Sequence, residues 1–115
     1  MAEIPLRTRA HKYLKTRQGT WINGGELERL ALTAGYKGST ISREMRRMAE
    51  ESHDGELDLG GYILRQERKS KRAGSTIRSV EYCYASQKTD HVLRIMAIDQ
   101  GQQNIKHFGM DDDEK

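Results

Sequence analysis

The sequence is short of the residues that mark secreted, membrane and disulfide-stabilised proteins. It contains one cysteine, Cys83, in 115 residues, which excludes an internal disulfide and offers a metal ion only one thiol. No stretch approaches the roughly 18 apolar residues that a membrane span requires. The amino-terminal "MAEIPLRTRAHK" has no apolar signal core. We therefore expect a soluble, cytoplasmic protein with no membrane contact.

Catalytic and metal-binding motifs are also missing. Cys83 and the histidines have no zinc-ligand spacing, and neither "NGG" nor "AGYKGST" has the glycine-lysine-hydroxyl pattern of a phosphate loop. The run His53, Asp54, Glu56 and Asp58 could be imagined as a hydrolytic site, but an acidic loop explains it with fewer assumptions. The sequence predicts neither an enzyme nor a bound cofactor or metal.

The composition fits one small, polar domain with an uneven charge distribution. Hydrophobic residues make up 35% of the chain and charged residues 32%, so only a compact core is expected. Residues 1–88 hold 17 lysines and arginines against 11 acidic residues, a net charge of +6. Residues 89–115 hold 3 against 6, a net charge of −3. Basic bodies of this size commonly meet polyanions, and an acidic tail can either tune that attraction or aid solubility.

Apolar residues recur at helical spacing in the first third of the chain. Residues 5–18 predict a first helix, which is followed by a short extended run, "TWI". A second helix is expected over residues 23–35, "NGGELERLALTAG", in which Asn23 and Glu26 have the spacing of a capping box. Gly35 is the expected end of that helix.

The third expected helix lies in "YKGSTISREMRRMAEE" and separates apolar from cationic residues most clearly. Ile41, Met45 and Met48 are spaced to face a core, and Ser39 or Thr40 is placed to cap the first turn. The opposite direction falls to Ser39, Arg43, Arg46, Arg47 and Glu50. The arginines are therefore expected on the outer surface.

Two alternating segments, residues 62–69 and 76–85, predict a β-hairpin joined by the loop "SKRAGS". From Tyr62 to Arg78 there are six lysines and arginines against one glutamate, so the hairpin is the most basic element of the chain. Before it, "SHDGELDLGG" predicts a polar connection in which Leu57 and Leu59 pack under the sheet. After it, "TDHVLRIMAID" fits either a short helix capped by Thr89 or Asp90 or an extra strand, and the tail beyond it is expected to be mobile.

This order of elements resembles the winged helix-turn-helix family of DNA-binding proteins. The resemblance covers residues 5–85 and is carried mainly by "GSTISREMRRMAEE", with support from "GTWINGGELERLA" upstream and "RSVEYCYA" downstream. It implies an α+β fold, with a winged helix of three helices, a short strand and a β-hairpin wing in a domain over residues 1–88. Residues 89–115, beyond the resemblance, are expected to add a C-terminal helix or strand and an acidic tail. The resemblance also implies that the third helix enters the major groove of double-stranded DNA and that the wing touches the backbone or minor groove. The connection "ESHDGELDLGGY" is longer and more acidic than is usual in the family, which leaves the orientation of the wing open.

The predicted DNA contacts fall into two sets. On the third helix they are Ser39, Thr40, Ser42, Arg43, Arg46 and Arg47. Arg43 has the reach and the paired donors to take guanine O6 and N7, so it would carry most of the discrimination between base pairs. On the wing and the turn before the third helix the contacts are Lys37, Arg68, Lys69, Lys71 and Arg72, which would neutralise phosphates and set the salt dependence of binding. We expect a small transcriptional regulator of the cytoplasm or nucleoid, whose compactness and lack of a sensing domain favour a phage, virus or mobile element as its source.

Three alternatives stay open at this stage. The same basic face would suit a protein-interaction module, antirepressor- or inhibitor-like, that docks onto an acidic partner. The apolar residues Val92, Leu93, Ile95, Met96 and Ile98 would either form a homodimer interface or cover the chain's own core. Trp21 would either cover the helix pair or be exposed to a partner.

Tyr82 and Tyr84 are expected to pack in the hairpin rather than to stack on bases, because they share a face with Val80.

Overall fold

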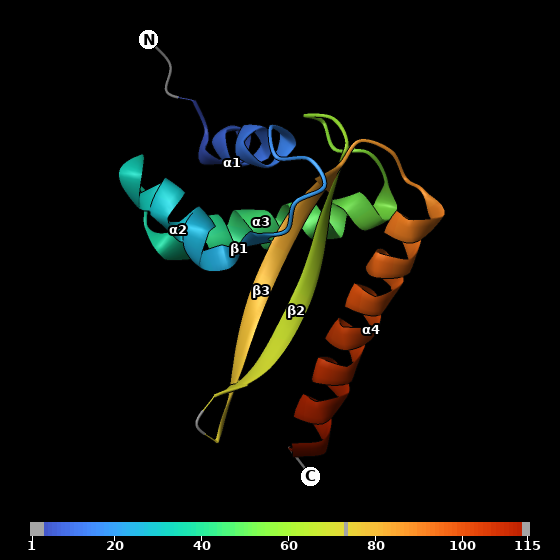
Figure 1. The fold of residues 1–115 in the computed structure, drawn as a ribbon. Helices are drawn as coiled ribbons and strands as arrows, with labels where there is room; N and C mark the ends of the chain where they lie inside the picture. The colour runs from blue at the N-terminus through green and yellow to red at the C-terminus, as the bar shows by residue number, and fades with distance from the viewer. Residues whose placement is uncertain (1–3, 73, 114–115) are drawn as a thin grey trace.

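The computed structural model describes the backbone of residues 4–72 and 74–113, together with their side chains except those of residues 70–72, 77 and 102–113. Over these residues the chain has an α+β fold of four helices and one three-stranded antiparallel sheet (Figure 1). No helix in this part of the chain combines the length and the apolar character that crossing a membrane would require.

Two helices flank a very short strand, and a long helix, a hairpin and a final helix follow. The bounds are α1 Leu6–Lys15, β1 Ile22–Asn23, α2 Gly24–Thr33, α3 Gly38–Asp54, β2 Tyr62–Arg72, β3 Ser75–Ala85 and α4 Asp90–Asp113. The sheet order is β1-β3-β2, and the register of the hairpin runs unbroken from Tyr62 opposite Ala85 to Arg72 opposite Ser75. The α+β class expected from the sequence is confirmed.

Local signals set both ends of α2. The side chain of Asn23 accepts a 2.7 Å hydrogen bond from the Gly25 N–H, so Asn23 caps the helix as its position in the sequence predicted. Glu26 accepts instead from the Tyr13 hydroxyl on α1. Gly35 ends the helix at a φ of 88°, a conformation that L side chains rarely adopt, and turns the chain toward α3.

The predicted cap of α3 is wrong. The helix begins at Gly38 with Lys37 as its N-cap residue, and no side chain hydrogen-bonds to its first turn. Ser39 and Thr40 therefore lie inside the first turn and leave its N–H groups without a side-chain acceptor.

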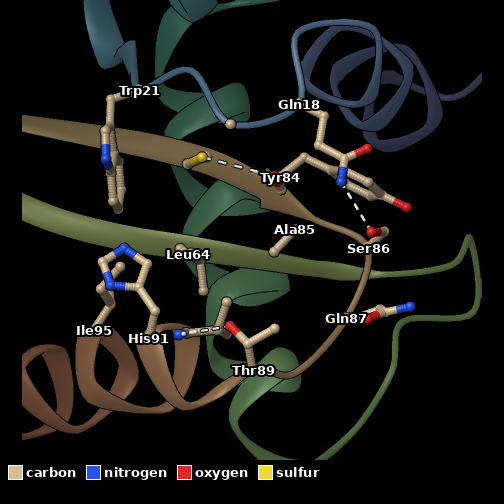
Figure 2. A pocket seen from close by; sticks show the side chains of 13 residues that line it. Gln18, Trp21, Leu64, Tyr84, Ala85, Ser86, Gln87, Thr89, His91 and Ile95 are labelled. Atoms are coloured by element: carbon tan, nitrogen blue, oxygen red, sulfur yellow. Dashed lines mark hydrogen bonds between the residues drawn. The ribbon is translucent and has the colours of Figure 1, made fainter.

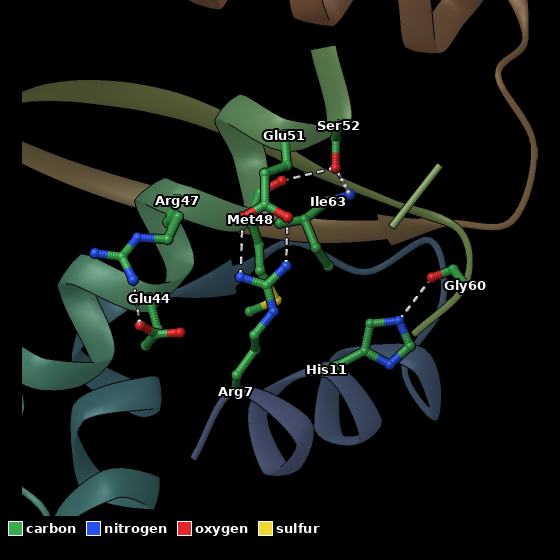
Figure 3. Close-up of polar contacts among 9 residues, drawn as sticks. All are labelled: Arg7, His11, Glu44, Arg47, Met48, Glu51, Ser52, Gly60 and Ile63. Carbon is green, nitrogen blue, oxygen red and sulfur yellow. Dashed lines mark hydrogen bonds and ion pairs between the residues drawn. The ribbon is translucent and has the colours of Figure 1, made fainter. Parts of the chain in front are cut away.

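α3 also extends to Asp54, into the segment that the sequence marked as a polar connection. The reason is Ser52, which is fully buried. Its hydroxyl donates to the Met48 carbonyl and accepts from the Ile63 N–H, both at 2.8 Å, so it joins the last turns of α3 to β2 (Figure 3). A polar residue that satisfies both bonds inside the protein extends the helix where its polarity suggested a loop.

The predicted six-residue hairpin loop is also wrong. β2 continues to Arg72 and β3 starts at Ser75, with these two residues paired. Gly74 has a φ of 81°, and a tight two-residue hairpin turn uses such a residue. The polar residues assigned to a loop therefore belong to strands, and the hairpin projects from the body as a long ribbon (Figure 1).

One core fills the space between the first three helices and one face of the sheet. Its buried residues are Leu6, Ala10, Leu14, Ile22, Leu27, Ala31, Ile41, Met45, Met48, Ala49, Leu57, Ile63, Tyr82 and Tyr84. The inward stripe predicted for α3 is confirmed. Leu57 joins this core, whereas Leu59 is 36% exposed. Because Tyr82 and Tyr84 are both buried, they are packing residues and offer no ring to a base.

The connection between α3 and β2 is fixed against α1 and β3. His11 donates a 2.7 Å hydrogen bond from Nε2 to the Gly60 carbonyl (Figure 3). Its ring also meets the Tyr84 ring edge-on, with the ring centres 5.3 Å apart. Gly61 has a φ of 68°, and a Cβ atom there would lie 2.5 Å from carbons of the Tyr84 ring. Gly60 and Gly61, at the end of the long acidic connection, are therefore held against α1 and β3.

The segment after β3 forms a helix, which decides between the two structures that the sequence allowed. The Val92 N–H donates to the Thr89 hydroxyl at 3.3 Å, so Thr89 caps the helix. Helical backbone continues to Asp113, well past the short helix expected. α4 runs beside β2 along the length of the hairpin (Figure 1).

The contacts of α4 place it along the open edge of the sheet. Val92 and Met96 are buried with Leu64 and Cys83, while Asp99 is bonded to Arg65. Leu64 and Arg65 are consecutive in β2 and point to opposite faces, so a helix that reaches both must cover the strand's edge.

The apolar cluster predicted on α4 is divided between the interior and the surface. Val92 and Met96 are buried and Ile95 is half-buried against the sheet, which supports a role in the chain's own core. Leu93 and Ile98 are 46% and 61% exposed. Trp21 is half-buried and packs against the same cluster.

Candidate nucleic-acid interface

The outer side of α3 carries the arginines that the sequence placed there. Arg43, Arg46 and Arg47 are exposed, as are Ser39 and Ser42. Thr40 is half-buried, so it offers less surface than its neighbours. Lys37 is exposed directly before the helix, and the first turn contains no acidic residue. The positive end of the helix dipole is thus open to an anion.

Arg46 points toward the hairpin. Together with Ser42 it lines a cleft of about 300 Å³, whose other walls are the start of α2 and Arg78 and Val80 of β3. Neither Arg46 nor Arg78 has a hydrogen-bonded or ion-paired partner in the part of the chain whose side chains are described. Two cations from separate elements therefore share one cleft. Glu28 of α2 also lines it, but no ion pair among the described side chains joins Glu28 to either arginine.

The strand register shows which of the predicted wing residues share the sheet face of Arg78. Lys69 is directly opposite Arg78, so both belong to the sheet face that turns toward α3. Arg68 is opposite Ser79 and belongs to the other face. There its guanidinium lies 3.8 Å from the Glu81 carboxylate. Of the predicted wing contacts, Lys69 shares the sheet face of Arg78 and Arg68 does not.

The side chains of Lys71 and Arg72, the remaining predicted wing contacts, lie outside the described residues. Their backbone belongs to the last part of β2, next to the hairpin turn.

Arg47 points to the other side of α3, toward α1. Its guanidinium lies 3.3 Å from Glu44, one turn earlier (Figure 3). Nearby, Arg7 of α1 holds Glu51 by two hydrogen bonds of 3.0 and 2.5 Å. These hydrogen bonds, which Arg7 donates and Glu51 accepts, lower the pKa of Glu51 and raise the pKa of Arg7. Two of the carboxylates among the arginines are therefore already paired, and Arg47 is the least available of the three arginines.

Unlike Arg47, Arg43 is not paired with a carboxylate among the described side chains. It is exposed on the outer side of α3, and no ion pair or hydrogen bond among the described residues engages its guanidinium. Its five N–H donors are free for a ligand.

Arg78 is the candidate contact that the sequence-based set omitted. Because side chains alternate between the two faces of a strand, the sequence already predicted that Arg78 shares a face with Val80 and Tyr82. That signal shows which residues share a face but not what the face turns toward. Only the packing of α3 against this side of the sheet makes Arg78 a neighbour of Arg46.

Sites for other chemistry are not apparent in the described part of the chain. It contains no group of three or more histidine, cysteine and acidic side chains placed to hold a metal ion. Cys83 is buried, and burial raises the pKa of its thiol, which disfavours the nucleophilic thiolate.

Comparison with protein-family models, with curated proteins and with solved structures finds no match to this chain. Function is therefore inferred from the geometry of α3 and the hairpin.

Proposed function

We propose that the protein binds double-stranded DNA sequence-specifically, as a small winged-helix transcriptional regulator, with α3 in the major groove and the β2–β3 hairpin on the backbone or minor groove. The observation that carries the proposal is the cleft shared by Arg46 of α3 and Arg78 of β3. Cations from two elements that converge on one side of a protein form the electrostatic footprint of a polyanion-binding surface.

The architecture supports the same interpretation. Two helices around a short strand, a third helix and an antiparallel hairpin, with the sheet order β1-β3-β2, are compatible with a winged helix. In that fold the hairpin lies beside the helix that enters the major groove, so both elements reach the duplex together.

The exposed residues of α3 suggest a division of roles. Arg43 is solvent-exposed and unpaired in the first half of the helix, where bidentate hydrogen bonds to guanine would discriminate by about 1–3 kcal/mol. Ser39 and Ser42 are short enough to let the helix approach the groove. Arg46, Arg78 and Lys69 would hold phosphates and contribute affinity rather than sequence choice.

Selection of bound sequences from random duplexes, carried out at two salt concentrations, tests the proposal. We expect a recovered motif, and we expect Arg43→Ala to lose preference at one base pair of that motif. Arg94→Ala removes the same charge from an exposed position of α4 and should leave the motif unchanged. Failure to enrich any sequence, or binding that does not weaken with salt, would reject sequence-specific DNA binding.

A second candidate function is docking of an acidic protein, and a groove between α1 and α2 favours it. The groove has a volume of about 540 Å³ and combines apolar Ile4, Tyr13 and Leu30 with three cations, Arg9, Lys12 and Arg17. No acidic residue lines it. Arg17 is held over the Tyr13 ring at 3.7 Å, so part of this charge is fixed in place.

A pull-down from nuclease-treated lysate separates the two functions. Protein docking predicts a stoichiometric partner that is retained by the wild type and lost by Lys12→Glu, while DNA binding by that variant persists. Loss of every retained protein after nuclease treatment would argue against docking.

A further inference from the structure

A second cleft lies on the opposite face of the sheet from α3, between β3 and the first turns of α4. It has a volume of about 300 Å³. Its floor is formed by Leu64 and Cys83, which are 3% and 5% exposed, and α4 contributes Val92 and Ile95 (Figure 2). The side chain of Trp21, next to β1, and that of His91 on α4 point toward one another across it (Figure 2).

The walls of this cleft differ in charge from the rest of the protein. Aspartate, glutamate, lysine and arginine make up 32% of the chain, yet none of them is among the thirteen residues that line the cleft. Gln18, Ser86, Gln87 and Thr89 supply uncharged polar groups at the exposed rim, where Gln18 donates a 2.9 Å hydrogen bond to the Ser86 hydroxyl. A charged ligand would therefore lose hydration in this cleft without a lysine, arginine, aspartate or glutamate side chain to pair with.

The size and the side chains of the cleft restrict its ligand further. A cavity of about 150 Å³ accommodates benzene, so a cleft of about 300 Å³ suits one or two fused rings. Indole and imidazole rings on facing walls offer flat surfaces to a flat molecule. Small-molecule sites have this combination of an apolar interior and a few polar groups at one end.

We propose that this cleft is a binding site for a small, uncharged, planar aromatic molecule, inserted between Trp21 and His91 with its apolar face over Leu64 and Cys83. Such a ligand bridges the strand region before α2 and the start of α4. The site is separate from the DNA-binding surface proposed on α3, and its existence does not depend on DNA binding.

A matched pair of probes tests the charge requirement. 2-Naphthalenemethanol and 2-naphthoate have the same ring system, but only the second carries a carboxylate. Saturation-transfer NMR on the full chain measures binding of each, and the rate of Cys83 alkylation by iodoacetamide locates it, because Cys83 is the only cysteine. We expect the alcohol to bind and to slow alkylation at least about threefold when the cleft is mostly occupied, and the carboxylate to bind at least about tenfold more weakly, a difference of about 1.4 kcal/mol.

A matched pair of variants tests the location. Ala85→Leu adds the same atoms inside the cleft that Ala97→Leu adds at an exposed position of α4 outside it. Binding of the alcohol should be lost in Ala85→Leu and kept in Ala97→Leu. If Ala85→Leu does not fold, His91→Ala at an exposed wall position serves instead and should weaken binding at least about threefold. No binding of the alcohol, equal or tighter binding of the carboxylate, or binding that survives in a folded Ala85→Leu protein would overturn the proposal.

Discussion

The guanidinium of Arg65 donates a 2.8 Å hydrogen bond to the carboxylate of Asp99, and this pair joins β2 to α4 in the interior. Only 4% and 1% of the two side-chain surfaces are exposed. Nε2 of His53 on α3 lies 3.3 Å from the second oxygen of Asp99. Burial disfavours the charge of Arg65, but the hydrogen bond and the charge of Asp99 raise its pKa above the ordinary value. Three elements therefore meet around an ionised pair.

Removing the carboxylate of this pair should be strongly destabilising. Asp99→Ala removes the nearer of the two carboxylates that pair with the buried Arg65 guanidinium and leaves only Glu67, at 3.3 Å. Breaking a buried pair typically costs about 3–5 kcal/mol, and the remaining carboxylate places the expected cost at the lower end, about 3 kcal/mol. Urea denaturation followed by circular dichroism measures the free energy of unfolding. Asp54→Ala removes an exposed aspartate from the end of α3 and should change that free energy by less than about 0.5 kcal/mol. Equal effects of the two substitutions would show that the pair does not hold α4 in place.

Gly61 and Gly60 allow backbone strain to be separated from a side-chain collision. Both have positive φ, 68° and 100°, but only a Cβ at Gly61 would overlap the Tyr84 ring. Gly60→Ala should therefore cost about 1 kcal/mol of unfolding free energy through its backbone alone. Gly61→Ala should cost at least about 2 kcal/mol more, because the buried tyrosine has to shift. Similar losses in the two variants would contradict the close packing of this connection on β3.

The Arg7–Glu51 pair predicts a small stability difference that depends on pH. The hydrogen bond from Arg7 holds the pKa of Glu51 below its ordinary value in the folded protein. Its stabilising contribution is therefore complete above the unfolded-state pKa of about 4.3, and it is lost as the pH falls through the folded-state value. At pH 7 Glu51→Gln should cost below about 1 kcal/mol, because the carboxylate is 44% exposed.

Glu50→Gln is the matched control for this pair, since it alters the adjacent, exposed glutamate of the same helix. Thermal unfolding from pH 7 to pH 3 should show the Glu51→Gln difference shrinking toward zero. A difference that is independent of pH, or one that Glu50→Gln reproduces, would mean that the ion pair is not its cause.

Periodicity was sufficient to predict which side of α3 is buried. Ile41, Met45 and Met48 recur at helical spacing and lie in the core, while Arg43 and Arg46 lie outside. Helical geometry decides this arrangement within a few turns, so that no distant contact is needed to predict it.

Residues whose environment depends on distant segments could not be placed from sequence. Arg65 belongs to the most basic stretch of the chain, and nothing in that stretch distinguishes it from the exposed cations around it, yet it is buried and bonded to Asp99 on α4. Ser52 was predicted to belong to a polar connection, yet it lies in α3, where its hydroxyl donates one hydrogen bond and accepts another. Asp99 is 34 residues from Arg65 and Ile63 is 11 residues from Ser52, and residue type alone does not reveal such distant partners.

The two faces of the hairpin give the sharpest test of the DNA-binding proposal. Arg78 turns toward Arg46 of α3, whereas Arg68 is on the other face beside Glu81. Arg78→Ala should weaken binding about tenfold for all duplex sequences, and it should reduce the slope of log affinity against log salt by about 1. Arg68→Ala removes the same charge from the same strand pair and should leave both quantities within error. Fluorescence anisotropy with labelled duplexes from 50 to about 300 mM salt measures the slopes, a range in which phosphate contacts dominate the change in affinity. If Arg68→Ala weakens binding as much as Arg78→Ala, the duplex does not lie on the face that the hairpin shares with α3, and the proposed docking of α3 in the major groove has to be abandoned.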